Sequence, residues 1–335
     1  MKPKSMKTIL LAALLAPGAL FAQTTATTTP VGYTTQTLPP AQFSFVGITL
    51  HNSVISSGVV TDESSTSITV SGVNFETLLG IHSASSPTYI LELPDGTISE
   101  VSSWTSAGVL NLPDDVTGLV TPNTTTYKLR KADTISDIFG ATNSAGLKPD
   151  TDGDFQNNAD LVFVIGANGA PTIVYYYNDG DSQGWFTGGG APAENLPIVY
   201  ADGFYIRRQA GSSLDLTISG EVKTASTKGI LISGFNFLSS VVPVGATLGN
   251  SGLSNFIAPD TTGDFQASNV DNVLLPQSNG SFITAYYYND GDSQGWFTGG
   301  GADATNLPID GAFIILNRGA AKSYTLASPS FYSSL

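Results

Sequence analysis

Short hydrophobic or alternating runs follow one another along the chain, each bounded by Gly, Pro, Asn, Asp or Ser. Successive side chains of a strand point to opposite faces, so this pattern is typical of half-buried strands joined by tight turns. It predicts an all-β fold of tandem antiparallel sandwich- or barrel-like modules. The predicted strands are 45–50, 67–73, 89–93, 127–131, 161–165, 172–177, 204–208, 214–218, 229–233, 282–288 and 313–317.

One segment, 134–139, has a helical pattern instead. Thr134 and Asp137 have the spacing of a capping box, in which each side chain accepts a backbone N–H of the other residue. Gly140 follows directly and is suited to end the helix, because glycine readily adopts a positive φ.

The first 22 residues have the pattern of a secretory signal peptide. A Lys-rich start precedes the apolar run 8–16, and Ala22 is the expected last residue to be removed. The run is much shorter than the about 20 residues that span a bilayer, so the mature chain is expected to lack a transmembrane segment. Residues 23–30 form a Thr-rich spacer. The sequence thus predicts an exported protein that is periplasmic, extracellular or attached to the cell surface.

The composition is strongly acidic. The full chain has 13 basic and 27 acidic residues, and residues 1–22 hold three basic and no acidic ones, which leaves 10 − 27 = −17 for the mature chain. This charge repels nucleic acid and anionic membrane surfaces, and it favours cations or cation-bridged assembly. The chain has no cysteine, so disulfides do not contribute to its stability.

Internal repeats carry the most information. The string YYYNDGDSQGWFTGGGA occurs at 175–191 and again at 286–302, and PDTDGDFQ (149–156) corresponds to PDTTGDFQ (259–266). A further pair is SGVNF (71–75) and SGFNF (233–237). We interpret the chain as three related β modules, 31–135, 136–218 and 219–335, of which the first is the most divergent.

The two copies are far more alike in the repeated segment than before it. Between 175–198 and 286–309, 22 of 24 positions agree, whereas between 161–174 and 272–285 only 3 of 14 agree. Gene conversion or a constraint on the residues themselves explains such a contrast.

The repeated segment has two interpretations. As a binding site it supplies aromatic faces for sugar rings and polar groups for hydroxyls. The candidate ligand-binding residues are Tyr175, Tyr177, Gln183, Trp185, Tyr286, Tyr288, Gln294 and Trp296. As structure, the same tryptophans form a module core and the glycines allow close backbone packing, and this second interpretation is favoured because aromatic residues are most often buried.

Alternating carboxylates suggest a Ca²⁺ site. Hard oxygen ligands at alternate positions are typical of Ca²⁺ loops. The candidate ligands are Asp150, Asp152, Asp154, Asp179, Asp181, Asp290 and Asp292. An EF-hand is excluded because Leu161 and Gly190 occupy the twelfth positions, where a bidentate Glu is needed, and Asx turns explain the same residues without a metal.

Signals for catalysis are poor. The chain has two histidines, His51 and His82, and none of the G-x-S-x-G, H-E-x-x-H or Walker motifs. A glycosidase with two carboxylates distant in sequence remains a possible interpretation.

Several strings together resemble a family of exported bacterial β-proteins to which no activity is assigned. They are TPVGYTTQTLP (29–39), YKLRKADTISDIFG (127–140), GDFQ (153–156) and the YYY…GWF segment. The resemblance covers nearly the whole mature chain and implies export and repeated β modules, but no chemistry.

The function expected from the sequence is that of a non-catalytic, secreted structural or interaction protein of the bacterial cell envelope or extracellular matrix. Its repeated segments would contact other copies of the chain or a cell-surface glycan. The alternative is a carbohydrate-binding protein that uses Trp185 and Trp296 as stacking residues, and the third interpretation is a glycan-acting hydrolase.

Overall fold

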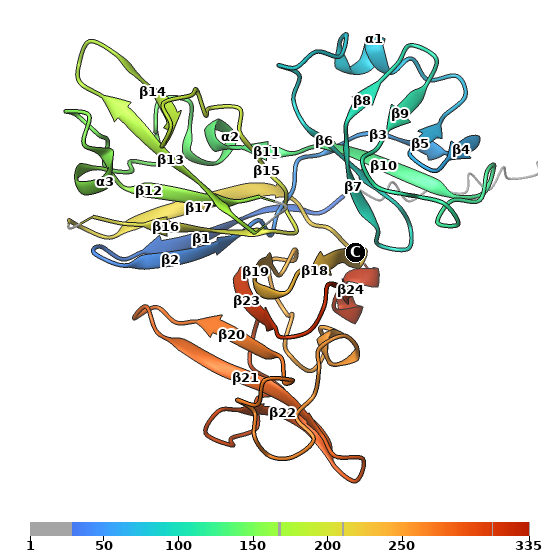
Figure 1. Ribbon diagram of the computed structural model, residues 1–335. Helices are drawn as coiled ribbons and strands as arrows, with labels where there is room; N and C mark the ends of the chain where they lie inside the picture. The colour runs from blue at the N-terminus through green and yellow to red at the C-terminus, as the bar shows by residue number, and fades with distance from the viewer. Residues whose placement is uncertain (1–28, 167–168, 210, 310, 335) are drawn as a thin grey trace, which may run out of the picture.

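The computed structural model describes residues 29–166, 169–209, 211–309 and 311–334 (Figure 1). The predicted signal peptide, 1–22, and residues 23–28 of the Thr-rich spacer lie outside the described residues. Strands contain 43% of the residues and helices 7%, which confirms the all-β class. The chain forms three lobes, two at the top of the view and one at the bottom.

The first five-stranded antiparallel sheet belongs to the upper left lobe and has the order β14-β13-β12-β16-β2. Its strands are β2 (Phe43–Gly47), β12 (Leu161–Ile165), β13 (Pro171–Asn178), β14 (Gln183–Thr187) and β16 (Gly203–Arg207). A two-stranded ribbon of β1 (Val31–Leu38) and β17 (Leu214–Glu221) accompanies it.

The second five-stranded sheet belongs to the lower lobe and has the order β19-β23-β20-β21-β22. Its strands are β19 (Gly234–Ser239), β20 (Asn272–Pro276), β21 (Phe282–Asn289), β22 (Gln294–Thr298) and β23 (Ala312–Asn317). The ribbon beside it pairs β18 (Thr227–Leu231) with β24 (Lys322–Leu326). Element by element, the two sheets and their ribbons have the same order, which is the arrangement that an internal duplication would produce.

The upper right lobe is built from residues 54–131 and has a separate hydrophobic core. One of its sheets has the order β3-β10-β6-β7 and the other β4-β5-β9-β8. The strands of this lobe are β3 (Val54–Val59), β4 (Asp62–Ser64), β5 (Ser67–Thr69), β6 (Tyr89–Glu92), β7 (Ile98–Val101), β8 (Ser103–Trp104), β9 (Val109–Asn111) and β10 (Thr126–Lys131). It also contains helix α1 (Phe75–Leu79).

The strand pairing differs from the module boundaries that we drew at 31–135 and 136–218. Strands β1 and β2 pair with β17 and β16, far along the chain, and therefore complete the first five-stranded sheet. Residues 54–131 are thus inserted between two strands of that sheet. Repeats in the sequence do not reveal this arrangement, because pairing between distant strands leaves no local pattern.

The similar strings SGVNF and SGFNF have different structures. In the first, Asn74 caps α1 by accepting the backbone N–H of Thr77 at 2.9 Å, and Phe75 begins the helix. In the second, Phe237 lies within β19. Their similarity therefore does not mark equivalent positions.

The predicted helix is present as α2 (Ile135–Phe139). Thr134 is its N-cap, the capping box with Asp137 is formed, and Gly140 ends it with φ 83°. The remaining short elements are β11 (Asp133–Thr134), β15 (Pro197–Ile198), α3 (Phe155–Asn158) and the 3₁₀ helices η1 (Leu253–Asn255) and η2 (Ser330–Ser334). In the described part of the chain, no helix is long and apolar enough to cross a membrane.

The two five-stranded sheets are in close contact, and one continuous hydrophobic core extends through both. A Cβ added to Gly47 of β2 would lie 2.6 Å from the carbonyl carbon of Gly311, so glycine is required for this approach. On the outer side, Phe45 packs against Phe237 and Phe282 with ring centroids 6.1 and 5.2 Å apart. The two lobes that contain the five-stranded sheets therefore form one packed unit.

Candidate functional site

The two repeated segments form two hairpins of identical register, β13–β14 and β21–β22. Tyr176 lies opposite Trp185 in the first hairpin, and Tyr287 lies opposite Trp296 in the second. Directly opposed residues share a face of the sheet, and the faces alternate along each strand. Each hairpin thus has an inner face with these residues and an outer face with their neighbours.

Both tryptophans are buried on the inner face, with 1% of Trp185 and 3% of Trp296 exposed. Trp185 packs edge-on against Tyr176 with centroids 5.1 Å apart and donates a 2.9 Å hydrogen bond from Nε1 to the carbonyl oxygen of Gly140. A ring in this position cannot stack on a sugar. The predicted stacking role of Trp185 and Trp296 is therefore wrong, and the packing interpretation explains these two residues.

The two candidate glutamines lie at the turn ends of the hairpins, where Gln183 is opposite Asn178 and Gln294 is opposite Asn289. The hydroxyl of Tyr176 donates to Oε1 of Gln183 at 3.0 Å, and Tyr287 donates to Gln294 at the same distance. Both glutamines are exposed, and their carbonyl oxygens are held by these buried or half-buried tyrosines. They therefore lie at the rim of the hairpin rather than within a closed site.

The outer face of each hairpin carries a row of half-exposed rings, which we call the outer aromatic row. Its members are Phe155, Tyr175, Phe186 and Tyr177 in the first hairpin and Phe265, Tyr286, Phe297 and Tyr288 in the second. Phe155 stacks on Tyr175 with centroids 4.3 Å apart and planes 9° apart. The corresponding pair in the second hairpin is 5.1 Å and 17° apart.

The outer aromatic row brings the two repeated strings together. The GDFQ string contributes its phenylalanine, and the YYY…GWF segment contributes the other three rings. Sequence reasoning identified the tyrosines of this face and missed all four phenylalanines, although the recurrence of GDFQ in both copies was the available signal.

A carboxylate lies at the end of each row. The hydroxyl of Tyr177 donates to Oδ2 of Asp179 at 2.8 Å, while Oδ1 accepts the backbone N–H groups of Asp181 at 3.0 Å and Ser182 at 2.8 Å. These hydrogen bonds lower the pKa of Asp179, and the bond from the N–H of Ser182 has the largest effect. The hydrogen bond to Asp179 in turn raises the pKa of Tyr177. The second hairpin repeats this arrangement.

The second copy uses Tyr288 and Asp290, with Oδ2 accepting at 2.7 Å. Oδ1 of Asp290 accepts the N–H groups of Asp292 at 3.0 Å and Ser293 at 2.7 Å. Each hairpin therefore ends in a negatively charged, tightly hydrogen-bonded turn.

The carboxylates predicted to form a Ca²⁺ loop do not converge on one point. Both oxygens of Asp152 accept from Asn158, at 2.8 and 2.7 Å, and both of Asp154 accept from Asn157, at 3.2 and 3.0 Å. Within the described ranges, no group of three or more His, Asp or Glu side chains is placed to hold a metal ion. Asp150 is different, because it is fully buried and pairs with strand β13.

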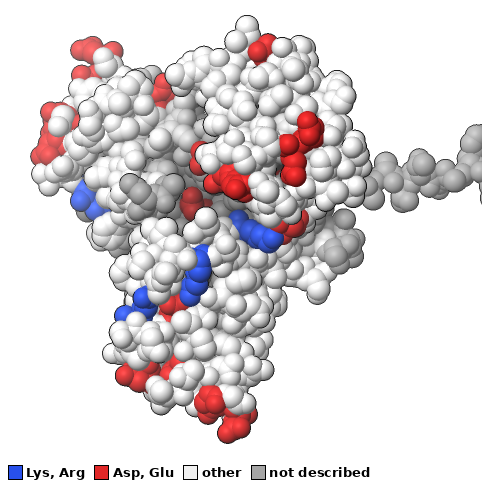
Figure 2. All heavy atoms as spheres, turned by 45° about the vertical axis from the view of Figure 1, so that its right-hand side comes forward, with Lys and Arg blue, Asp and Glu red and all other residues white. Residues whose placement is uncertain are grey.

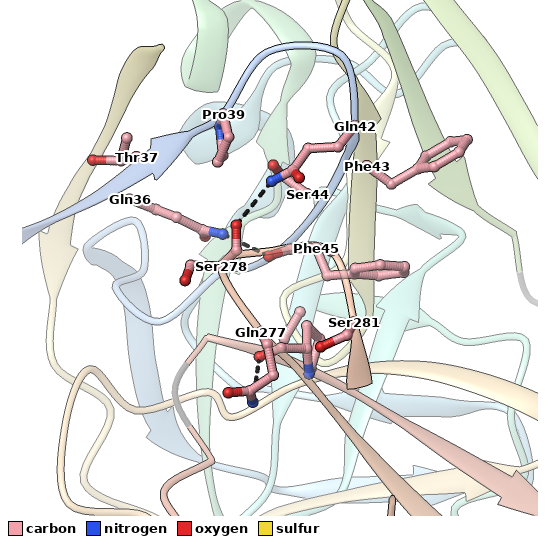
Figure 3. Close-up of a pocket in the computed structure, with 13 residues that line it drawn as sticks. Gln36, Thr37, Pro39, Gln42, Phe43, Ser44, Phe45, Gln277, Ser278 and Ser281 are labelled. Atoms are coloured by element: carbon pink, nitrogen blue, oxygen red, sulfur yellow. Dashed lines mark hydrogen bonds between the residues drawn. The ribbon is translucent and has the colours of Figure 1, made fainter. Parts of the chain in front are cut away.

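A polar pocket of about 250 Å³ lies where the first strands meet the turn between β20 and β21 (Figure 3). Gln36 donates to the carbonyl oxygen of Phe45 at 2.8 Å, and Gln42 donates to that of Ser278 at 2.9 Å. Ser44 is one of the lining residues, and its hydroxyl is buried and has no hydrogen-bond partner among the described residues.

None of the residues that line this pocket is charged. They come from 36–45 and 276–281 and from Ala312, so the sequence does not place them together. Amide and hydroxyl groups without charge suit a neutral ligand with hydroxyl groups. The volume is below the about 300–1,000 Å³ typical of small-molecule sites, so one sugar ring is the largest ligand that it suits.

No protein-family model, no curated protein and no solved structure matches this chain.

Proposed function

We propose that this chain is a non-catalytic, exported structural protein of the bacterial cell envelope or extracellular matrix that assembles with its own copies through the two hairpins. The observation that carries this proposal is that one surface occurs twice. Both outer aromatic rows and both acidic turns agree in residues, register and hydrogen bonds.

The two copies lie in different lobes, at the upper left and at the bottom of the molecule (Figure 1). Figure 2 shows acidic side chains at the outer ends of these lobes, and both acidic and basic ones nearer to the middle of the molecule. A rigid unit with the same contact surface at two separate ends can join two neighbours, so contacts between hairpins would extend into chains.

The rings suit such a contact because half-exposed aromatic residues contribute much of the energy of interfaces. The acidic turns oppose it, since like charges repel when two hairpins meet. Assembly should therefore depend on cations that offset this charge, in keeping with the mature net charge of 10 − 27 = −17.

Sedimentation velocity tests the proposal with the chain lacking residues 1–22, over a range of concentrations in Ca²⁺. The wild-type chain is expected to form oligomers of increasing length. Phe186→Ala or Phe297→Ala alone should stop growth at dimers, because one functional hairpin remains, and the double variant should stay monomeric. A wild-type chain that is monomeric throughout, or single variants that grow like the wild type, would reject the proposal.

Carbohydrate binding is a second candidate, now based on the polar pocket instead of the tryptophans. The unpartnered Ser44 hydroxyl and the uncharged lining favour it. Titration calorimetry with glucose, galactose and N-acetylglucosamine should show binding to the wild-type chain that Ser44→Ala weakens. Glucuronate is the charged control, and equal binding of all four sugars by both chains would dismiss this candidate.

A further inference from the structure

We propose that each hairpin binds one Ca²⁺ ion at a buried carboxylate, Asp150 in the first copy and Asp260 in the second. This inference rests on the proposed function, since such ions would offset the charge of the assembling hairpins. It is carried by a feature that occurs twice and that the hairpin fold alone does not explain.

Asp150 and Asp260 are both fully buried, with 0% of each residue exposed. Oδ1 of Asp150 accepts the backbone N–H of Gly153 at 3.1 Å, and Oδ1 of Asp260 accepts that of Gly263 at 2.8 Å. The other oxygen, Oδ2, is buried without a hydrogen-bond partner in both copies. Native proteins rarely leave a buried polar atom unpaired, so two equivalent cases require an explanation.

Other deeply buried carboxylates of the described chain have a cationic partner. Asp160 pairs with Arg208 at 2.7 Å, Glu92 pairs with Arg130 at 2.8 Å, and Asp271 pairs with Lys322. No such ion pair is formed by Asp150 or Asp260 among the described residues. Removing an unpaired carboxylate from water costs several kcal/mol, and a bound cation would offset that cost.

The unpaired oxygens lie on the outer face of each hairpin. The backbone N–H of Asp150 donates to Tyr176 and its carbonyl accepts from Asn178, both at 2.8 Å. This parallel bridge sets Asp150 opposite Tyr177, so their side chains share a face.

The polar side chains that the bridge sets on this face offer oxygen donors. They are the carboxylate of Asp150, the hydroxyl of Tyr177 and the carboxylate of Asp179, to which Tyr177 donates. Oxygen ligands select hard cations, and Ca²⁺ accepts irregular arrangements completed by water, whereas Mg²⁺ requires a near-octahedral one. The ligand class is therefore a divalent hard cation, and Ca²⁺ fits it best.

The same site explains which residues are constant between the copies. Asp150 and Asp179 have the counterparts Asp260 and Asp290, whereas Asp152 is replaced by Thr262. Asp152 is exposed and held by Asn158, so its loss leaves the buried carboxylate in place. The two repeated strings meet at this carboxylate, which supplies a reason for their preservation. The ligand set predicted from alternating Asp residues is thus narrowed to one buried Asp and one turn Asp per hairpin.

Titration calorimetry with CaCl₂ after treatment with EDTA tests the site. The wild-type chain should bind two Ca²⁺ ions, Asp150→Asn and Asp260→Asn one each, and the double variant none. Asp152→Asn is the matched control and should still bind two. A wild-type chain that binds no Ca²⁺, or an Asp150→Asn/Asp260→Asn chain that still binds two, would overturn the inference.

A variant could also fail to bind Ca²⁺ because it is misfolded. Thermal unfolding distinguishes this case from the loss of the binding site. In EDTA, the double variant should melt at or above the wild-type temperature, since it lacks two uncompensated carboxylates. Added Ca²⁺ should raise the melting temperature of the wild type only.

Calorimetric titration of the Phe186→Ala/Phe297→Ala chain with CaCl₂ separates the Ca²⁺ site from the proposed assembly. Two ions bound to this monomeric chain support the site whether or not the wild type assembles.

Discussion

The indole nitrogen of Trp185 donates a 2.9 Å hydrogen bond to the carbonyl oxygen of Gly140, the residue that ends helix α2. Trp104 in the inserted lobe makes the corresponding bond, 2.7 Å long, to Gly80 at the end of α1. Both rings also pack on a tyrosine, with centroids 5.1 Å apart. An indole that packs on a tyrosine and donates to the glycine at the end of a short helix thus occurs in two lobes of different topology.

Trp185→Phe should lower the free energy of unfolding by about 2–4 kcal/mol, because it leaves a cavity and an unpaired carbonyl oxygen at Gly140. Urea unfolding followed by tyrosine fluorescence measures this loss. Asp181→Asn, in the exposed turn of the same hairpin, should change stability by less than about 0.5 kcal/mol. A Trp185→Phe chain as stable as the wild type would contradict the structural role of this ring.

Gly47→Ala should separate the two five-stranded sheets slightly and lower the free energy of unfolding by about 1–3 kcal/mol, the usual cost of overpacking. The added Cβ would lie 2.8 Å from Oγ of Ser239 as well as against the backbone of Gly311. Gly32→Ala is the matched control, since nothing lies within 4 Å of a Cβ there. Equal urea midpoints for the two variants would show that the sheets do not meet at Gly47.

Arg130→Leu should lower the free energy of unfolding by about 3–5 kcal/mol, because it leaves the buried carboxylate of Glu92 and the half-buried one of Glu221 without their cationic partner. Arg130 bonds to Glu92 at 2.8 Å and to Glu221 at 2.8 Å, and so joins the inserted lobe to strand β17. The comparison is Lys131→Leu, which breaks an exposed pair with Asp137 and should cost less than about 1 kcal/mol. Urea unfolding measures both, and similar losses would mean that the Arg130 cluster does not hold the lobes together.

Eleven of the 24 strands in the described part of the chain, and the helix at 134–139, could be predicted because their signals are local. Alternation marks a half-buried strand, and Thr134, Asp137 and Gly140 follow one another at intervals of three residues. The pairing of β2 with β16 has no such signal, since more than 150 residues separate Gly47 from Gly203. The insertion depends on this pairing, and the polar pocket depends on the approach of residues 276–281 to residues 36–45, which are likewise distant in sequence. Both were missed for the same reason.

The repeated segment drew attention to the two hairpins, but composition alone does not tell which face of a hairpin a ring occupies. Trp185 and Tyr175 are both aromatic, and only the strand register buries the first and exposes the second in part. The buried state of Asp150 is also a tertiary property, because it follows from the bridge to Tyr177.

His51→Gln should reduce the loss of stability in acid. Burial lowers the pKa of His51 to about 3, and its Nε2 lies 2.8 Å from the carbonyl oxygen of Val241. Between pH 6.5 and 3 the unfolded chain binds a proton here that the folded chain does not, so stability falls as the pH falls through this window. Urea unfolding at pH 7.5 and 4.5 should show a smaller difference for the variant, and an unchanged difference would refute the assignment.

Asp202→Asn should reduce the loss of stability that occurs as the pH rises, whereas His51→Gln reduces the loss in acid. Burial, with a smaller contribution from Glu100, raises the pKa of Asp202 to about 7, well above the unfolded value of about 4. Between these values the folded chain binds more protons than the unfolded chain, so the contribution of this group to stability falls as the pH rises. Asp202 also forms a β-bridge with Leu238 of β19, so its ionisation would destabilise the contact between the two sheets. The wild type should therefore lose more stability than the variant between pH 5 and pH 8 in urea unfolding. Asp181→Asn, in an exposed turn, should follow the wild type, and a variant with the full wild-type loss would show that Asp202 is ionised throughout.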